Sequence, residues 1–162
     1  MYSIKSFRSL AAILCSFVSL SLSAETSTNP AAAEKKSVIP GQEFTAAELE
    51  ASANAAKAWL ASMDGNRYAD SYDKMSSLSK FTIKKDEWLQ IIEKTRRPFG
   101  SVTSREVQDQ RTAIDPSGMP RGDYIVMFYK TKFSRQTGYE LVTLYREDGK
   151  WTVLTYQVDG SK

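Results

Sequence analysis

The sequence predicts an α+β domain in which three N-terminal helices pack on a curved, four-stranded antiparallel sheet. Apolar residues recur at helical spacing before Gly100 and at every second position after it. The second half also contains Asp148-Gly149, a strong signal for a tight hairpin. Helices that come first in the chain and strands that come last favour a meander with helices on one face.

The helices are predicted from their end signals and their apolar spacing. Thr45 and Glu48 can form a capping box, because each side chain can accept a hydrogen bond from the other residue's free backbone N–H. Gly65 ends this first helix, since glycine tolerates the left-handed conformation that follows a helix. A second helix is predicted over 68–75 and a third over about 83–95.

Four segments rich in Val, Ile, Thr, Tyr and Phe are predicted as strands, over 102–112, 124–133, 138–146 and 151–158. A two-residue turn at 148–149 is expected to place Val142 opposite Thr155. A four-residue turn at 135–138 is expected to place Tyr129 opposite Leu144. These pairings set the register of the two hairpins.

The predicted register assigns the sheet residues to two faces. The core face is expected to hold Ile125, Met127, Tyr129, Phe133, Val142, Leu144, Trp151 and Val153. The outer face is expected to hold five large side chains, Phe128, Leu141, Tyr145, Leu154 and Tyr156. Because monomers rarely leave large apolar patches bare, we expect a homodimer or a protein partner on this outer face.

Residues 1–24 have the pattern of a cleavable secretory signal peptide. Lys5 and Arg8 precede an apolar run that is too short to cross a bilayer comfortably, and small residues follow up to Ser23 and Ala24. We therefore expect cleavage after Ser23 or Ala24 and an exported protein, periplasmic or secreted. An uncleaved membrane anchor is the alternative interpretation.

Composition limits the chemistry that the remaining chain can perform. Residues 25–43 are predicted to be a flexible linker and 44–162 a single α+β domain. The chain has no histidine, and its single cysteine, Cys15, lies in the predicted signal peptide. Histidine- and cysteine-dependent nucleophilic catalysis is thereby excluded, and we expect no metal or cofactor. Loss of two basic signal residues lowers the net charge from +3 to +1, which argues against a nucleic-acid partner.

Three residues are the candidates for a binding site: Arg105, Glu140 and Tyr129. Glu140 falls on the predicted apolar face, and Arg105 shares a strand face with Val107. Because burial of either charge alone is costly, we expect the two to form a buried pair. Glu140 and Tyr129 could instead serve as base and donor of a small-molecule isomerase or hydro-lyase. We favour the structural pair, and hence a non-enzymatic binding or interaction module.

The third predicted helix and its flanks are rich in basic residues, Lys80, Lys84, Lys85, Lys94, Arg96 and Arg97. Such a cluster could face an anionic partner or a lipid surface. Three acidic residues on the same segment offset half of this charge, which favours an ordinary solvated helix face.

Several short motifs occur in a characteristic order. They are Trp59, Asp64, Gly65, Tyr68, Ser71 and Tyr72, then Trp88, Arg97-Pro98-Phe99-Gly100, Ser104-Arg105, Pro120, Gly122, Asp123, Tyr124, Thr131-Lys132-Phe133, Glu140 and Asp148-Gly149-Lys150-Trp151. This order resembles the exported bacterial family called domain of unknown function 4019, over roughly residues 50–158. Tyr72 and Thr155 depart from the family pattern, which has Trp and Gly there. The resemblance implies a fold similar to the cystatin-like, nuclear-transport-factor-2-like cone, and it implies no reaction.

Overall fold

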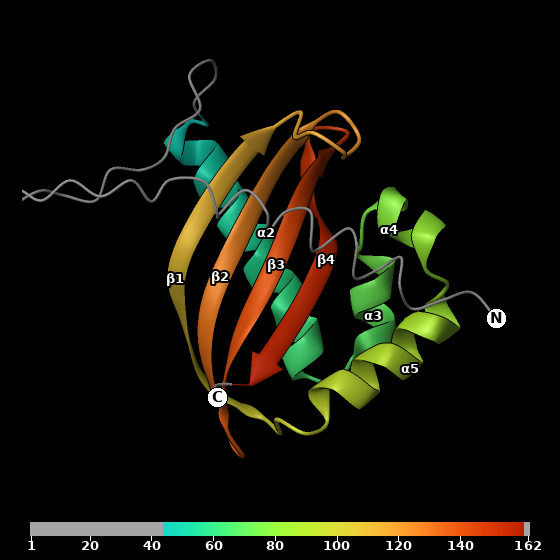
Figure 1. Ribbon diagram of the computed structural model, residues 1–162, viewed down its shortest axis with the longest axis vertical. Helices are drawn as coiled ribbons and strands as arrows, with labels where there is room; N and C mark the ends of the chain where they lie inside the picture. Colours follow the sequence, from blue (N-terminus) through green and yellow to red (C-terminus); the bar gives the residue numbers. More distant parts are fainter. Residues whose placement is uncertain (1–43, 161–162) are drawn as a thin grey trace, which may run out of the picture.

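The computed structural model describes residues 44–160, where four helices precede a four-stranded antiparallel sheet (Figure 1). The helices are α2 (Ala46–Asp64), α3 (Tyr68–Asp73), α4 (Ser77–Thr82) and α5 (Lys85–Arg96). The strands are β1 (Val102–Ile114), β2 (Asp123–Phe133), β3 (Thr137–Glu147) and β4 (Lys150–Gly160), paired in the order β1-β2-β3-β4. The predicted α+β class is confirmed. The predicted signal peptide and linker lie outside the described residues.

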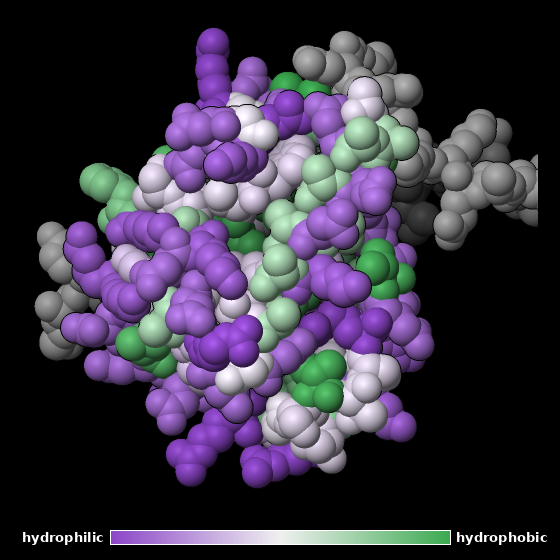
Figure 2. All heavy atoms as spheres, turned by 180° about the vertical axis from the view of Figure 1, so that it is seen from behind, coloured by the Kyte–Doolittle hydropathy of each residue, from purple (hydrophilic) through white to green (hydrophobic). Residues whose placement is uncertain are grey.

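Helix α2 lies across one face of the curved sheet, and α3 and α5 extend beyond the β4 edge (Figure 1). Its predicted capping box is present, since Glu48 N donates to Thr45 Oγ1 over 3.3 Å and Thr45 N donates to Glu48 Oε2 over 2.8 Å. Trp59, Leu60 and Met63 form its buried side. The side away from the sheet is largely hydrophilic in Figure 2, with only scattered hydrophobic side chains. No helix within 44–160 is long and apolar enough to cross a membrane.

The described residues contain one helix more than the sequence predicted. The second predicted helix ends at Asp73, and a separate short helix, α4, occupies the start of the segment expected to lead into the third. Ser76 caps α4 by accepting from Ser79 N over 3.1 Å. Ser79 Oγ in turn donates to Leu154 O over 2.6 Å, so α4 is attached to the edge of β4. A six-residue helix with only two large apolar residues, Leu78 and Phe81, has too little periodicity to be predicted.

The β3–β4 hairpin has the turn that the sequence predicts. Asp148 and Gly149 have φ values of 49° and 75°, both in the left-handed region that this two-residue turn requires. Leu144 pairs with Val153 as expected. The turn chemistry therefore fixes the start of this register.

A β-bulge next to Leu144 changes the register further along the same pair of strands. Beyond it Val142 pairs with Tyr156 and not with Thr155. One extra residue in a strand moves the following side chains to the opposite face. Tyr156 therefore belongs to the core, where it is 5% exposed, and its predicted place on the outer face is wrong.

The β2–β3 hairpin is tighter than predicted. Phe133 N donates to Gln136 O over 2.9 Å, and Gly138 already belongs to β3. As a result Tyr129 pairs with Glu140 and not with Leu144. The observed pairing differs from the predicted pairing by four positions. Because four is an even number, each side chain keeps its predicted face.

The predicted core face is confirmed in the structure. Ile125, Met127, Tyr129, Phe133, Val142, Leu144 and Val153 belong to the hydrophobic core, and Trp151 packs against it. The outer face is less apolar than predicted, because Leu154 is also buried, at 2% exposure. Phe128, Leu141 and Tyr145 remain there and are half-buried. A homodimer through this face stays a prediction.

Candidate functional site

Six polar side chains meet on the core side of the sheet, and we call them the polar cluster. They are Asp64 of α2, Arg96 of α5, Arg105 of β1, Thr131 of β2, Glu140 of β3 and Tyr156 of β4. Each of the four strands contributes one member, and so does the C-terminal end of each of the two long helices. The cluster therefore joins six elements at one point.

The predicted pair of Arg105 and Glu140 is confirmed. Arg105 Nε lies 2.6 Å from Glu140 Oε2, and the glutamate side chain is 0% exposed while the arginine side chain is 15% exposed. The period of two along the strands places both side chains on the core face. A charge buried this deeply needs its partner, because removal from water is costly.

Arg96 is a second partner of Glu140 that the sequence analysis missed. Its Nη1 lies 2.6 Å from Glu140 Oε1, and its side chain is 4% exposed. The guanidinium also lies over the Phe133 ring, 5.1 Å from the centroid. Arg96 had been grouped with the solvent-facing basic residues. Its spacing from Trp88 and Ile92, eight and four residues earlier on the buried side of α5, is the signal that could have placed it inside.

Asp64 is the second carboxylate of the polar cluster. It accepts two hydrogen bonds from Arg105, at 2.8 Å to Oδ2 and 2.9 Å to Oδ1, and one from Arg96 Nη2 over 2.9 Å. Two guanidinium groups thus face two carboxylates, and the cluster is neutral as a whole. The local sequence indicates Asp64 only as part of a helix end. Its side chain is 28% exposed, so the cluster reaches solvent on this side.

The carboxylate of Glu140 is fully occupied by protein donors. Oε1 accepts from Arg96 Nη1 and from the Tyr156 hydroxyl over 2.6 Å. Oε2 accepts from Arg105 Nε and from Thr131 Oγ1. Four donors match the roughly four lone-pair sites of a carboxylate. Burial, reinforced by Glu140, raises the pKa of Tyr156 well above its ordinary value, so the phenol keeps the proton that it donates.

Tyr129, the third candidate, is a neighbour of the polar cluster and not a member. It lies opposite Glu140 in the β2–β3 ladder and is 6% exposed. Its hydroxyl makes no hydrogen bond to the cluster among the residues that the structure describes. Burial raises its pKa to about 12, which leaves a neutral phenol at physiological pH.

Aromatic side chains fill the space beside the polar cluster. The Trp59 ring lies 6.1 Å from that of Trp88 and 5.3 Å from that of Tyr156, between ring centroids. Trp59 Nε1 donates to Ser71 O over 2.8 Å. Trp59 and Trp88 are therefore core residues, as their helical spacing predicts. Every fully buried side-chain nitrogen or oxygen within 44–160 has a hydrogen-bond partner.

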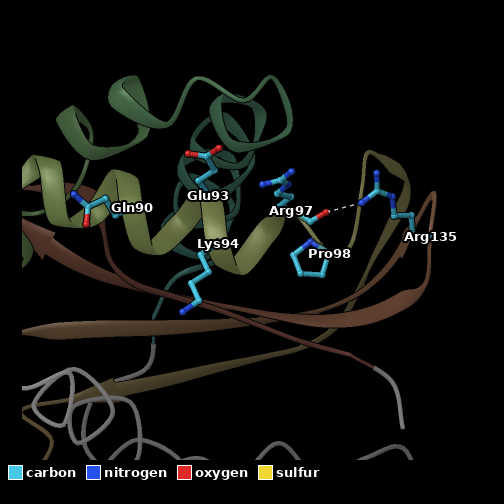
Figure 3. Close-up of a pocket in the computed structure, with 6 residues that line it drawn as sticks. All are labelled: Gln90, Glu93, Lys94, Arg97, Pro98 and Arg135. Carbon is cyan, nitrogen blue, oxygen red and sulfur yellow. Dashed lines mark hydrogen bonds between the residues drawn. The ribbon is translucent and has the colours of Figure 1, made fainter.

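A surface groove lies between the end of α5 and the β2–β3 hairpin, and we call it the basic groove (Figure 3). It has a volume of about 590 Å³ and is lined by Gln90, Glu93, Lys94, Arg97, Pro98 and Arg135. Its net charge is positive, because three cationic side chains face one carboxylate. No local sequence pattern predicts this groove, since Arg135 belongs to a turn whose position depends on the hairpin.

The wall of the basic groove is built by the contact of two loops. Arg135 Nη1 donates to Arg97 O over 3.0 Å, and Arg135 N donates to Phe99 O over 3.1 Å. Gly100 permits this approach, with φ of 81° and a position where a Cβ would lie 2.2 Å from Ser134 Oγ. These contacts hold the Arg135 side chain at the C-terminal end of α5.

No group of three or more His, Cys, Asp or Glu side chains suited to a metal ion occurs within 44–160.

Residues 55–156 match the family model described as Protein of unknown function (DUF4019). The chain belongs to the DUF4019 family. The DUF4019 match contains all six members of the polar cluster and all residues of the basic groove. Comparison of this DUF4019 chain with curated proteins and with solved structures gives no match. Its relation to the cystatin-like cone stays a prediction.

Proposed function

We propose that this DUF4019 protein is an exported, non-enzymatic binding module whose ligand occupies the basic groove. The main observation behind the proposal is that protein donors occupy all the hydrogen-bond acceptor sites of the Glu140 carboxylate. The carboxylate that could have served as a base is fully buried and accepts from four protein donors. The groove, in contrast, is open to solvent and lined by exposed polar side chains.

The alternative, an isomerase or hydro-lyase, requires a different environment around Glu140. A general base must come within hydrogen-bond distance of the proton that it removes. Here a substrate would have to displace Arg96, Arg105, Thr131 or Tyr156 from a packed interior. The contacts of the cluster therefore favour a structural role for Glu140.

The polar cluster supports the basic groove through two adjacent residues of the chain. Arg96 points into the core and binds Glu140 and Asp64, whereas Arg97 is exposed and lines the groove. The buried ion pairs thus hold the end of α5 on the sheet. This attachment gives the groove a fixed wall, which reduces the conformational entropy that the protein loses when a ligand binds.

Ligand binding at the groove can be tested by nuclear magnetic resonance of the purified, isotope-labelled protein. We expect members of a panel of short peptides, organic acids and oligosaccharides to shift the backbone amide signals of Lys94, Arg97 and Arg135. The amide signals of Tyr129 and Glu140 serve as the internal control and should stay unchanged. Shifts centred on the latter two residues would instead support a site inside the domain and an enzyme.

Export is supported by the charged, apolar and small-residue segments of 1–24. We expect the protein expressed in a Gram-negative host to begin within two or three residues of Glu25, as measured by mass spectrometry of the periplasmic fraction. The matched control is a variant with Leu14→Arg and Val18→Arg, whose broken apolar run should leave the precursor uncleaved. An intact Met1 on the exported wild-type protein would contradict the proposal.

A further inference from the structure

We propose that the basic groove binds an acidic peptide segment of a partner protein, whose carboxylates contact Arg97 and Arg135. This inference rests on the proposed function, because it names the ligand class of the same site. Three features support it: the positive charge of the groove, the position of its two guanidinium groups, and its open shape with a polar lining.

The cations of the groove lack the ion-pair partners that most other arginines of the domain have. Of the six other arginines within 44–160, Arg67, Arg96, Arg105, Arg111 and Arg146 form ion pairs and Arg121 does not. Within 44–160, Lys94, Arg97 and Arg135 form none. Their charges are therefore available to a ligand, and the single carboxylate of Glu93 offsets only one of them.

The two arginines lie at one end of the groove. Arg135 donates to the backbone oxygen of Arg97 over 3.0 Å, which keeps both residues close together (Figure 3). Planar guanidinium groups bind carboxylates through two parallel hydrogen bonds. Lys94 lies one helical turn before Arg97, but its side chain extends from the opposite side of α5 in Figure 3, so the two arginines are the main partners for a carboxylate.

The shape and composition of the groove favour a peptide over other anions. A volume of about 590 Å³ exceeds what one inorganic anion fills, and Gln90 and Pro98 add an amide and an apolar surface. An acidic peptide can place its carboxylates on the cations and its uncharged backbone near Glu93 and Gln90.

The proposal can be tested by fluorescence anisotropy with a fluorescein-labelled hexaglutamate peptide and the purified exported protein at low salt. We expect binding that falls roughly tenfold in the double variant Arg97→Ala and Arg135→Ala, which removes two charge-assisted contacts. Hexaglutamine should not bind. The matched control is Lys130→Ala with Lys132→Ala, two exposed cations of the outer sheet face, which should change affinity less than twofold.

A gain of affinity gives an independent test that does not depend on Arg135 and its structural hydrogen bond. Glu93 is exposed on α5, and Glu93→Lys should strengthen hexaglutamate binding several-fold at low salt. Circular dichroism should show unchanged folding of each variant. Equal affinities of wild type, the double arginine variant and Glu93→Lys would overturn the proposal.

Two further outcomes separate this inference from the proposed function. If hexaglutamate does not bind while another member of the ligand panel shifts the groove signals, the acidic peptide is wrong and the binding module stands. If neither occurs, both fail. Inorganic phosphate can be added so that its total negative charge equals that of the peptide carboxylates. Displacement of the peptide under this condition would show a simple anion site and would overturn the peptide assignment.

Discussion

Replacement of Glu140 by alanine is expected to lower the free energy of unfolding by about 3–5 kcal/mol, the usual cost of breaking a buried ion pair from one side. The carboxylate is 0% exposed, and its loss leaves Arg96 and Arg105 with Asp64 as their remaining carboxylate. It also leaves the hydroxyls of Thr131 and Tyr156 without their acceptor. Urea denaturation followed by circular dichroism measures the change.

The matched control for this prediction is Glu106→Ala. Glu106 is an exposed carboxylate on β1, and it lies opposite Lys130 in the β1–β2 ladder. Opposite charges at such cross-strand positions contribute about 0.2–1 kcal/mol. If Glu140→Ala cost no more than Glu106→Ala, the polar cluster would contribute little to stability.

Replacement of Arg96 by alanine should have an effect of similar size, about 3–5 kcal/mol. The guanidinium is 4% exposed and binds both carboxylates of the cluster. Arg105→Ala should cost less, because its side chain is more exposed and Arg96 still binds both Glu140 and Asp64. Arg97→Ala is the control one residue further along, and its exposed position predicts a change within about 0.5 kcal/mol.

A double-mutant cycle tests whether Arg96 and Glu140 act as one unit. Residues that share a hydrogen-bonded network show interaction energies of about 0.5–3 kcal/mol. The variant with both Arg96→Ala and Glu140→Ala should therefore lose less stability than the two single losses combined. Additive losses would show that the 2.6 Å contact between them carries no energetic coupling.

The buried pair of Arg105 and Glu140 could be predicted from sequence because side chains alternate between the two faces along a regular strand. The β2–β3 register differs by four positions from the prediction, yet Glu140 still points to the core. The residue types of Asp148-Gly149 were also enough to predict the β3–β4 turn, in which both residues adopt positive φ. The fold class depends on these robust signals.

Other features depend on information that no local pattern contains. The β-bulge beside Leu144 places Tyr156 in the core, and the strand sequence has no glycine there to indicate it. Arg96 is buried although arginine is usually exposed, because Glu140 and Asp64 supply its partners from distant positions. The basic groove forms only when the 134–136 turn meets the end of α5.

The composition of the polar cluster has a consequence for the time course of folding and unfolding. Its contacts join residues far apart in the chain, such as Arg96 and Tyr156, which are separated by 60 positions. We expect pairings of this range to form late, because the chain must first close its long loops. Interactions absent from the transition state slow unfolding without speeding folding. In a domain with no cysteine after Cys15 to cross-link it, the cluster would therefore govern how long the native state persists before it opens.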